Sequence, residues 1–135
     1  MRPRFLLLCS IALLAACTDS KDAAEDKLER TAEASASASG PAPVALGLNE
    51  VQLLDAELIG TDGVELGDVA QVVRGADGKV DRLLVEIEDS NPDRYVHVPI
   101  TGLTTVMRGT DTDLSTTMTK AELAALPELK LPPAP

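Results

Sequence analysis

The stretch "TDGVELGDVAQVVRGADGK", residues 61–79, decides the fold because two Asp-Gly pairs enclose a single run of largely apolar residues. Asp62-Gly63 and Asp77-Gly78 are typical of the tight turns that join antiparallel strands, since both residue types tolerate positive φ. The apolar positions between the turns slip by one across Gly67. A glycine at such a slip predicts a β-bulge, which bends a strand as a small barrel requires.

Further short strands are predicted on both sides of this stretch, at residues 56–60, 80–88, 95–100, 104–107 and 114–118, beside the bulged strand 64–74. Thr119 and Glu122 form a capping box that opens a short helix, which Pro127 ends. Asn49 and Gln52 form a similar box before the first strand. The pattern therefore predicts a mainly β domain, a small barrel or sandwich of five to six short strands with a short C-terminal helix.

Three stretches of this domain resemble the PRC-barrel family. They are "LIGTDGVELGDVAQVVRGADGKVDRLLVEI" (58–87), "YVHVPITGL" (95–103) and "TMTKAELAALP" (117–127). The resemblance covers about residues 45–130 and implies a PRC-type β-barrel over residues 44–130. It also implies an interaction module without a shared catalytic site, and thus a protein that is not an enzyme.

The N-terminus has the pattern of a lipoprotein signal. Residues 1–4 form a short basic stretch with two arginines. Residues 5–14 form an apolar run of half the length that spans a bilayer, which is about 20 residues. Leu14-Ala15-Ala16-Cys17 then resembles the bacterial lipobox. We expect residues 1–16 to be a cleaved signal peptide and Cys17 to carry a lipid. The alternatives are an ordinary signal peptide and a membrane anchor.

The residues after Cys17 bear on location and reach. Thr18, which is not acidic, favours the periplasmic face of the outer membrane over the inner membrane under the lipoprotein sorting rule. Residues 17–43 are rich in Ala, Ser and charge, with Leu28 as the single large apolar side chain. Such a composition predicts a flexible tether with a reach of roughly 28 Å. Residues 131–135 are expected to be a loose tail.

Charge narrows the class of partner. The chain has 12 Lys and Arg against 22 Asp and Glu, a net charge of −10. This balance excludes nucleic acid, whose phosphates need basic side chains, and electrostatic adhesion to anionic lipid. It leaves a protein partner or cations, with the membrane reached through the lipid on Cys17.

No motif indicates catalysis, a cofactor or a metal. The sole histidine, His97, could be grouped with Ser90 or Ser115 in a hydrolytic triad, but a mid-strand imidazole is more often structural. The acidic turns at Asp62, Asp77, Asp111 and Asp113 offer oxygen ligands without the spacing of an EF-hand loop. They leave open a cation-binding or small-ligand-binding envelope sensor or carrier as the alternative function.

The partner-binding residues predicted are Tyr95 and His97, on strand 95–100, and Arg94, directly before it. An open barrel leaves strand edges that accept an extended peptide, and Arg and Tyr are frequent hot-spot residues. The groove beside the helix that begins at Thr119 is a second candidate, with Tyr95 packed beneath that helix as the structural alternative. We therefore expect a lipid-anchored, periplasm-facing PRC-barrel protein that acts as a non-catalytic interaction or adaptor module of the cell envelope.

Overall fold

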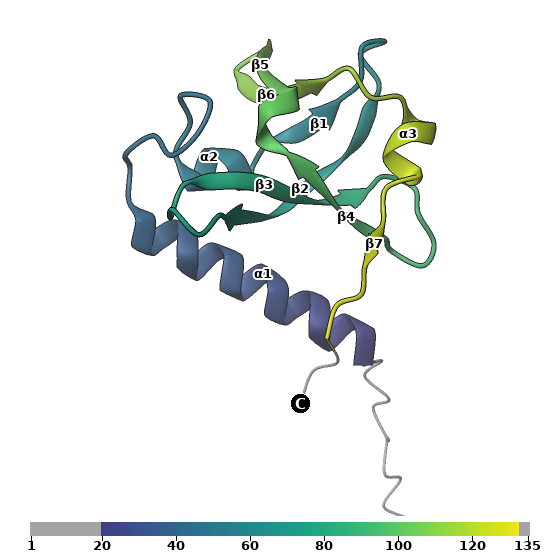
Figure 1. The fold of residues 1–135 in the computed structure, drawn as a ribbon, viewed down its shortest axis with the longest axis horizontal. Coiled ribbons are helices and arrows are strands. Elements are labelled where there is room, and N and C mark those ends of the chain that lie inside the picture. Colours follow the sequence, from purple (N-terminus) through teal and green to yellow (C-terminus); the bar gives the residue numbers. More distant parts are fainter. Residues whose placement is uncertain (1–19, 133–135) are drawn as a thin grey trace, which may run out of the picture.

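The computed structural model describes residues 20–132, which form one curved sheet with helices on its outer side and at its ends (Figure 1). In chain order the elements are α1 (Ser20–Ser39), α2 (Glu50–Leu54), β1 (Glu57–Ile59), β2 (Glu65–Arg74), β3 (Val80–Ile87), β4 (Tyr95–Pro99), the 3-10 helix η1 (Ile100–Gly102), β5 (Leu103–Arg108), β6 (Asp111–Thr116), α3 (Lys120–Ala124) and β7 (Glu128–Leu129).

The seven strands lie in the order β5-β6-β1-β2-β3-β4-β7, and every neighbouring pair is antiparallel except β1 and β6. The prediction of a mainly β fold with a short C-terminal helix is confirmed. The sheet has seven strands instead of five or six, and it is not closed into a barrel, because β5 and β7 remain at opposite edges. Pro99 and η1 end β4 and carry the chain away to the far edge, where β5 begins.

The turns of residues 61–79 are as predicted. Gly63 and Gly78 have φ of 78° and 77°, and the preceding aspartates each accept a hydrogen bond from the backbone two residues on. The β-bulge predicted at Gly67 is present, because the pairing of β1 with β2 slips by one residue between Gly67, opposite Leu58, and Glu65, opposite Ile59. Irregular pairing lies on both sides of this glycine, and a Cβ at Gly67 would come within 2.1 Å of the Glu86 carbonyl oxygen. Glycine is therefore required there by the close approach of β3.

Aliphatic side chains fill the concave side of the sheet. Seven residues of this core are fully buried: Leu53, Leu58, Leu83, Val85, Val96, Leu114 and Leu123. The two helices α2 and α3 cover the ends of the core through Leu53 and Leu123. Both predicted capping boxes are present, with each N-cap side chain and each N3 side chain bonded to the other's backbone N–H. The local sequence signals were therefore sufficient to predict where these two helices begin.

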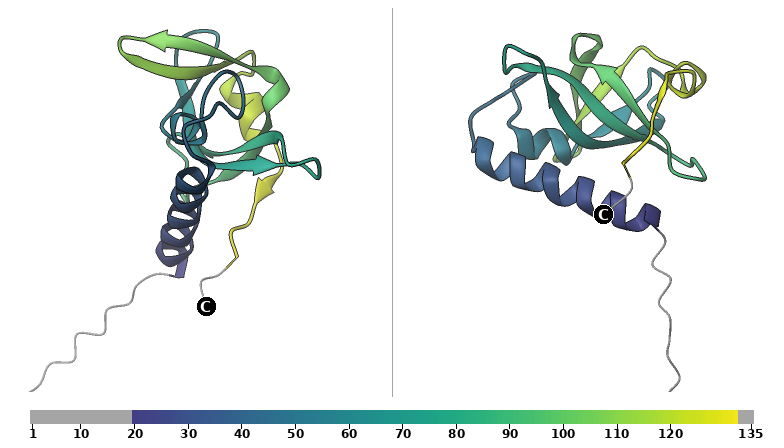
Figure 2. Two further views of the ribbon diagram at one scale, coloured as in Figure 1. Left: turned by 90° about the vertical axis from the view of Figure 1, so that its left-hand side faces the viewer. Right: turned by 60° about the horizontal axis from the view of Figure 1, so that its bottom comes forward.

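The prediction of a flexible tether is wrong for residues 20–39, which form α1. This long helix runs along the outer side of the sheet and packs against α2 and β2 (Figure 2). Ala24, Ala32 and Ala36 are buried on it, and Leu28 is half-buried between them. Positions that repeat every four residues lie on one face of a helix. The small side chains of this stripe can therefore all contact the sheet and hold α1 against it.

Two further points concern the chain ends. None of the helices within residues 20–132 is both long and apolar enough to cross a membrane. The predicted signal peptide and Cys17 lie outside the described residues. Of the predicted tail, Leu131 and Pro132 follow β7, which pairs with β4 and was not predicted.

Candidate functional site

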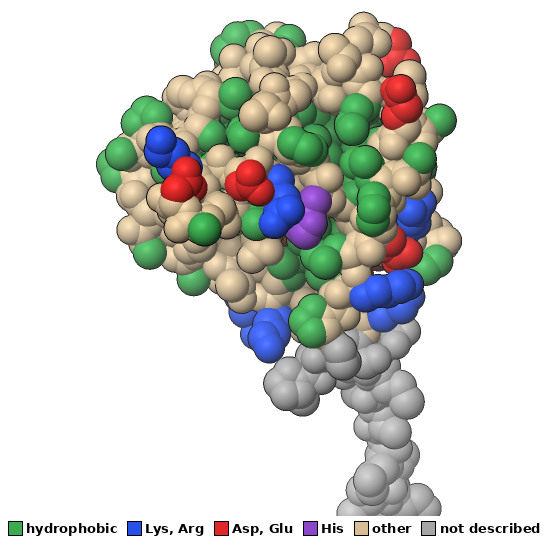
Figure 3. All heavy atoms as spheres, viewed as in Figure 1, with side chains coloured by type: hydrophobic (Ala, Val, Ile, Leu, Met, Phe, Trp, Pro, Cys, Tyr) green, Lys and Arg blue, Asp and Glu red, His purple; other side chains and the backbone are tan. Residues whose placement is uncertain are grey.

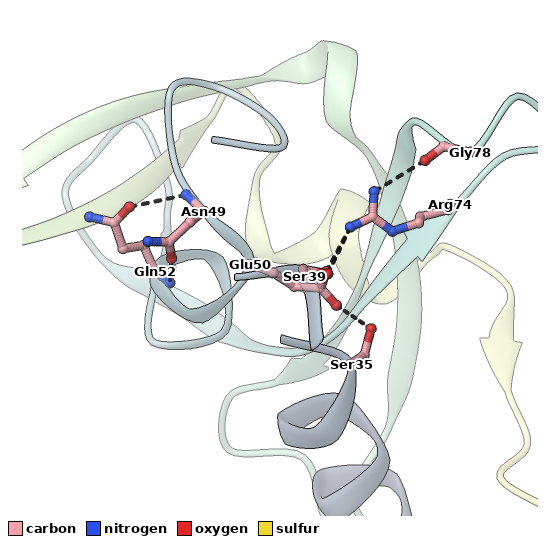
Figure 4. Close-up of polar contacts among 7 residues, drawn as sticks. All are labelled: Ser35, Ser39, Asn49, Glu50, Gln52, Arg74 and Gly78. Carbon is pink, nitrogen blue, oxygen red and sulfur yellow. Dashed lines mark hydrogen bonds and ion pairs between the residues drawn. The ribbon is translucent and has the colours of Figure 1, made fainter. Parts of the chain in front are cut away.

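A buried carboxylate joins α1 to the rest of the fold. Glu50, at the start of α2, is 1% exposed and accepts hydrogen bonds from the hydroxyls of Ser35 and Ser39 near the end of α1 (Figure 4). Arg74, at the end of β2, donates to Glu50 Oε2 over 2.7 Å. The other guanidinium nitrogen of Arg74 donates to the Gly78 carbonyl oxygen over 3.1 Å. Three segments that are distant in sequence, the end of α1, the start of α2 and the end of β2, thus meet at one carboxylate.

The electrostatics of Glu50 show that this contact is well satisfied. Burial alone would raise the pKa of its carboxyl group. The hydrogen bonds from Ser35, Ser39 and Arg74, together with the Arg74 charge, outweigh burial and hold the pKa below its ordinary value. Glu50 is therefore ionised at neutral pH and serves as a structural lock on α1.

A groove lies between α1 and the outer face of the sheet. It has a volume of about 680 Å³ and runs along α1 from Glu25 to Ser37, with α2, β2, β3 and β4 forming the opposite wall. Among the residues that the structure describes, no lysine or arginine lines it, and seven carboxylates do: Glu25, Asp26, Glu29, Glu33, Asp55, Asp68 and Glu86. Its apolar lining comes from both walls: Leu28, Ala32, Ala36, Val51, Leu54, Val69, Ala70 and Tyr95.

Burial and mutual repulsion perturb the acids of this groove. Burial raises the pKa of Glu86, and the hydrogen bond that the Tyr95 hydroxyl donates to Glu86 Oε2 over 3.2 Å opposes that rise. Burial and the nearby charge of Asp93 raise the pKa of Glu25. Apart from the exposed pair of Asp26 with Arg30 at 3.5 Å, no ion pair within residues 20–132 compensates the carboxylates of this groove.

The three predicted partner-binding residues do not form one surface, because each lies in different surroundings. Tyr95 is 4% exposed and lies on the groove side, so it does not pack beneath α3. The Arg94 guanidinium donates to the Ala124 carbonyl oxygen over 3.1 Å and lies 4.0 Å from a Glu128 carboxylate oxygen. Part of the β4 edge that we expected to be open is occupied by β7. Sequence reasoning missed the groove, because the helix that forms one of its walls was not predicted.

His97 has the surroundings of a structural residue. It is half-buried opposite Leu84, and burial and the Arg82 charge lower its pKa. Within residues 20–132 no hydrogen bond joins it to Ser90 or Ser115, and the Ser90 hydroxyl donates to the Ile87 carbonyl oxygen. Figure 3 shows acidic, basic and apolar side chains mixed on the face of Figure 1, with no large patch of one kind.

The acidic turns do not come together as a cation site. Asp62 and Asp77 each use one carboxylate oxygen inside their own turn, and Asp113 is buried, accepting from the Glu57 N–H over 3.1 Å. In the described part of the chain, the one group of acids close enough to share an ion is Glu65, Asp68 and Glu88. Burial, followed by the negative charge of its neighbours, raises the pKa of Glu65.

Comparison with models of known protein families found no match, and comparison with curated proteins found none either. The resemblance to PRC-barrel domains therefore stays a prediction from the quoted residues.

Proposed function

We propose that the protein is a lipid-anchored, periplasm-facing interaction module of the cell envelope, with a PRC-type domain and no catalytic role. One observation carries this proposal: the basic start and short apolar run lead directly into Leu14-Ala15-Ala16-Cys17. Such an order favours cleavage before Cys17 and transfer of a lipid to its thiol. Two or more acyl chains hold a protein on a membrane at about 0.8 kcal/mol per buried methylene.

The position of α1 changes how such an anchor would hold the domain. Cys17 precedes the first residue of α1 by three positions, and three residues span at most about 11 Å even when extended. While α1 is docked, its N-terminal end must therefore stay close to the membrane surface. The domain would rest near the headgroups instead of moving freely on a long tether.

The interaction role is supported by the surfaces that remain open. The two edge strands, β5 and β7, present unpaired backbone groups of the kind that accept an extended segment. Of the three predicted partner-binding residues, Arg94, half-buried beside β7, remains the proposed one, because Tyr95 is 4% exposed and His97 has structural surroundings. The mixed face of Figure 3 is suited to a protein partner more than to nucleic acid, which requires a basic surface.

Metabolic labelling with an alkyne fatty acid tests the anchor. The wild-type chain and the Cys9→Ala variant should both carry the label, because Cys9 lies in the segment removed on processing. The Cys17→Ala variant should carry none. Labelling of Cys17→Ala, or a wild-type chain without label, would refute the proposal, and separation of the two membranes by density would test the preference for the outer one.

A cation-binding sensor is the second candidate, and the Glu65, Asp68 and Glu88 group is the observation that favours it. The two candidates differ in a direct measurement on protein purified from solubilised membranes. A stoichiometric protein partner supports the interaction module, whereas Ca²⁺-dependent thermal stabilisation without a partner, lost in Glu65→Gln, supports the sensor.

A further inference from the structure

The groove between α1 and the sheet has two walls that come from different parts of the chain. The α1 wall presents Glu25, Glu29 and Glu33, and the opposite wall presents Asp68 and Glu86. Since α1 contributes few large apolar side chains, the walls do not close on one another over this length. A volume of about 680 Å³ is within the usual range of ligand sites, roughly 300–1,000 Å³.

The chemistry of the lining indicates a cation with an aliphatic body. Carboxylates attract positive charge, whereas Leu28, Leu54 and Val69 offer contact to methylene groups and none to a hydrated metal ion. We propose that this groove binds a linear aliphatic polyamine, whose ammonium groups pair with the carboxylates of both walls.

Spacing along α1 supports a linear ligand with regularly placed charges. Glu25, Glu29 and Glu33 follow one another at four-residue intervals, so neighbouring side chains start about 6 Å apart along the helix. Ammonium groups separated by three or four methylenes have a similar spacing. A polyamine lying along α1 can therefore contact successive carboxylates while its methylenes face the apolar floor.

The backbone of the two walls disfavours an extended peptide as the occupant. The N–H and C=O groups of α1 are bonded within the helix, and β3, in the middle of the sheet, pairs with β2 on one side and β4 on the other. A peptide in the groove would therefore find no backbone partners in either wall for its own amides. Polyamine methylenes have no such need.

Binding should also tighten the contact of α1 with the sheet. A bound polyamine places positive charge beside carboxylates on both walls, which opposes the effect of burial and repulsion on the pKa of Glu25 and Glu86. Because the ligand contacts both walls, it would bind only while α1 is docked. Ligand and helix therefore stabilise each other.

Calorimetric titration of the full-length protein in detergent with spermidine tests the proposal. We expect saturable binding with one ligand per chain, weakened by NaCl as ion pairing requires. The double variant Glu29→Gln/Glu33→Gln should bind at least about tenfold more weakly, which corresponds to about 1.4 kcal/mol. Both side chains are exposed and carry no hydrogen bond in the described structure, so circular dichroism should show an intact fold.

A control variant of equal charge separates the groove from the overall acidity. Asp81→Asn/Asp111→Asn removes two carboxylates that do not line the groove and should change the affinity less than twofold. An equal effect of both double variants, or the absence of saturable binding, overturns the proposal. The proposal is also overturned if Mg²⁺, at the same concentration of positive charge, displaces spermidine. It is overturned as well if trilysine binds more tightly than spermidine and depends on Glu29 and Glu33 in the same way.

Discussion

Replacement of Glu50 by glutamine perturbs the contact between α1 and the domain at one atom. The two side chains have the same shape, so the change removes charge without opening a cavity. In the wild type, the Glu50 carboxylate accepts from the Ser35 and Ser39 hydroxyls and from Arg74. The glutamine amide keeps one acceptor oxygen and directs an N–H group toward donors, so at least one donor loses its partner.

The magnitude follows from the burial of the two charged partners. Breaking a fully buried ion pair costs about 3–5 kcal/mol. The Glu50 side chain is 1% exposed but that of Arg74 is 35% exposed, so water compensates part of the loss. We expect a decrease of about 2–3 kcal/mol in the free energy of unfolding, or about 8–12 °C in Tm for a domain of this size.

Urea unfolding measures the stability, and hydrogen exchange measures where it is lost. In Glu50→Gln the amides of α1 should exchange faster than those of β3, because α1 depends on the lock and β3 is in the core. Glu33→Gln is the matched control on the same helix, exposed and without a hydrogen bond, and should change stability by less than about 0.5 kcal/mol. Unchanged α1 protection together with wild-type stability in Glu50→Gln would refute the role of Glu50.

Three further outcomes are expected. Burial raises the folded pKa of Glu86, so stability should increase as the pH falls through that pKa toward the ordinary value of 4.5. The folded pKa of Glu50 is lowered, so its contribution is present above 4.5 and is lost as the pH falls below it. Thermal unfolding across pH 3–7 measures both effects, and a stability that only falls on acidification would contradict the first. Gly67→Ala should lose about 3 kcal/mol or more in urea unfolding, since its Cβ would meet the β3 backbone, while Gly102→Ala, with open space, should change little. Leu123→Ala should cost about 2–5 kcal/mol by the same assay, because Leu123 is fully buried; a loss below 1 kcal/mol would mean that α3 is not part of the core.

The β domain was largely predictable because its signals are local. Asp-Gly pairs define turns over two residues, and a capping box defines a helix start over four, so Asn49, Thr119 and the boundaries of β2 and β3 could be located without tertiary information. In contrast, β6 begins at Asp111, three residues before the predicted start, and β7 was not predicted. The bulge beside Gly67 was predicted, whereas the β3 backbone that also requires a glycine there is about 20 residues away in sequence and could not be foreseen. Whether the sheet closes into a barrel depends on the direction in which the chain continues after η1. No short sequence pattern determines that direction.

The helix α1 was missed because its contacts are weakly apolar and distant. Ala24, Ala32 and Ala36 contribute little hydrophobicity each, although their four-residue spacing, continued by Leu28, was a usable signal. The lock itself joins Ser35 to Glu50, 15 residues away, and Glu50 to Arg74, 24 residues away. Neither pairing can be inferred from one sequence, and without α1 the groove has only one wall.

The intact mass of the protein purified from its own membranes tests the central claim most directly, because it reports processing and lipid together. The account predicts a chain that begins at Cys17 and carries the added mass of at least a diacylglyceryl group. A chain that retains residues 1–16, or one that begins at or near residue 17 with an unmodified thiol, would contradict it.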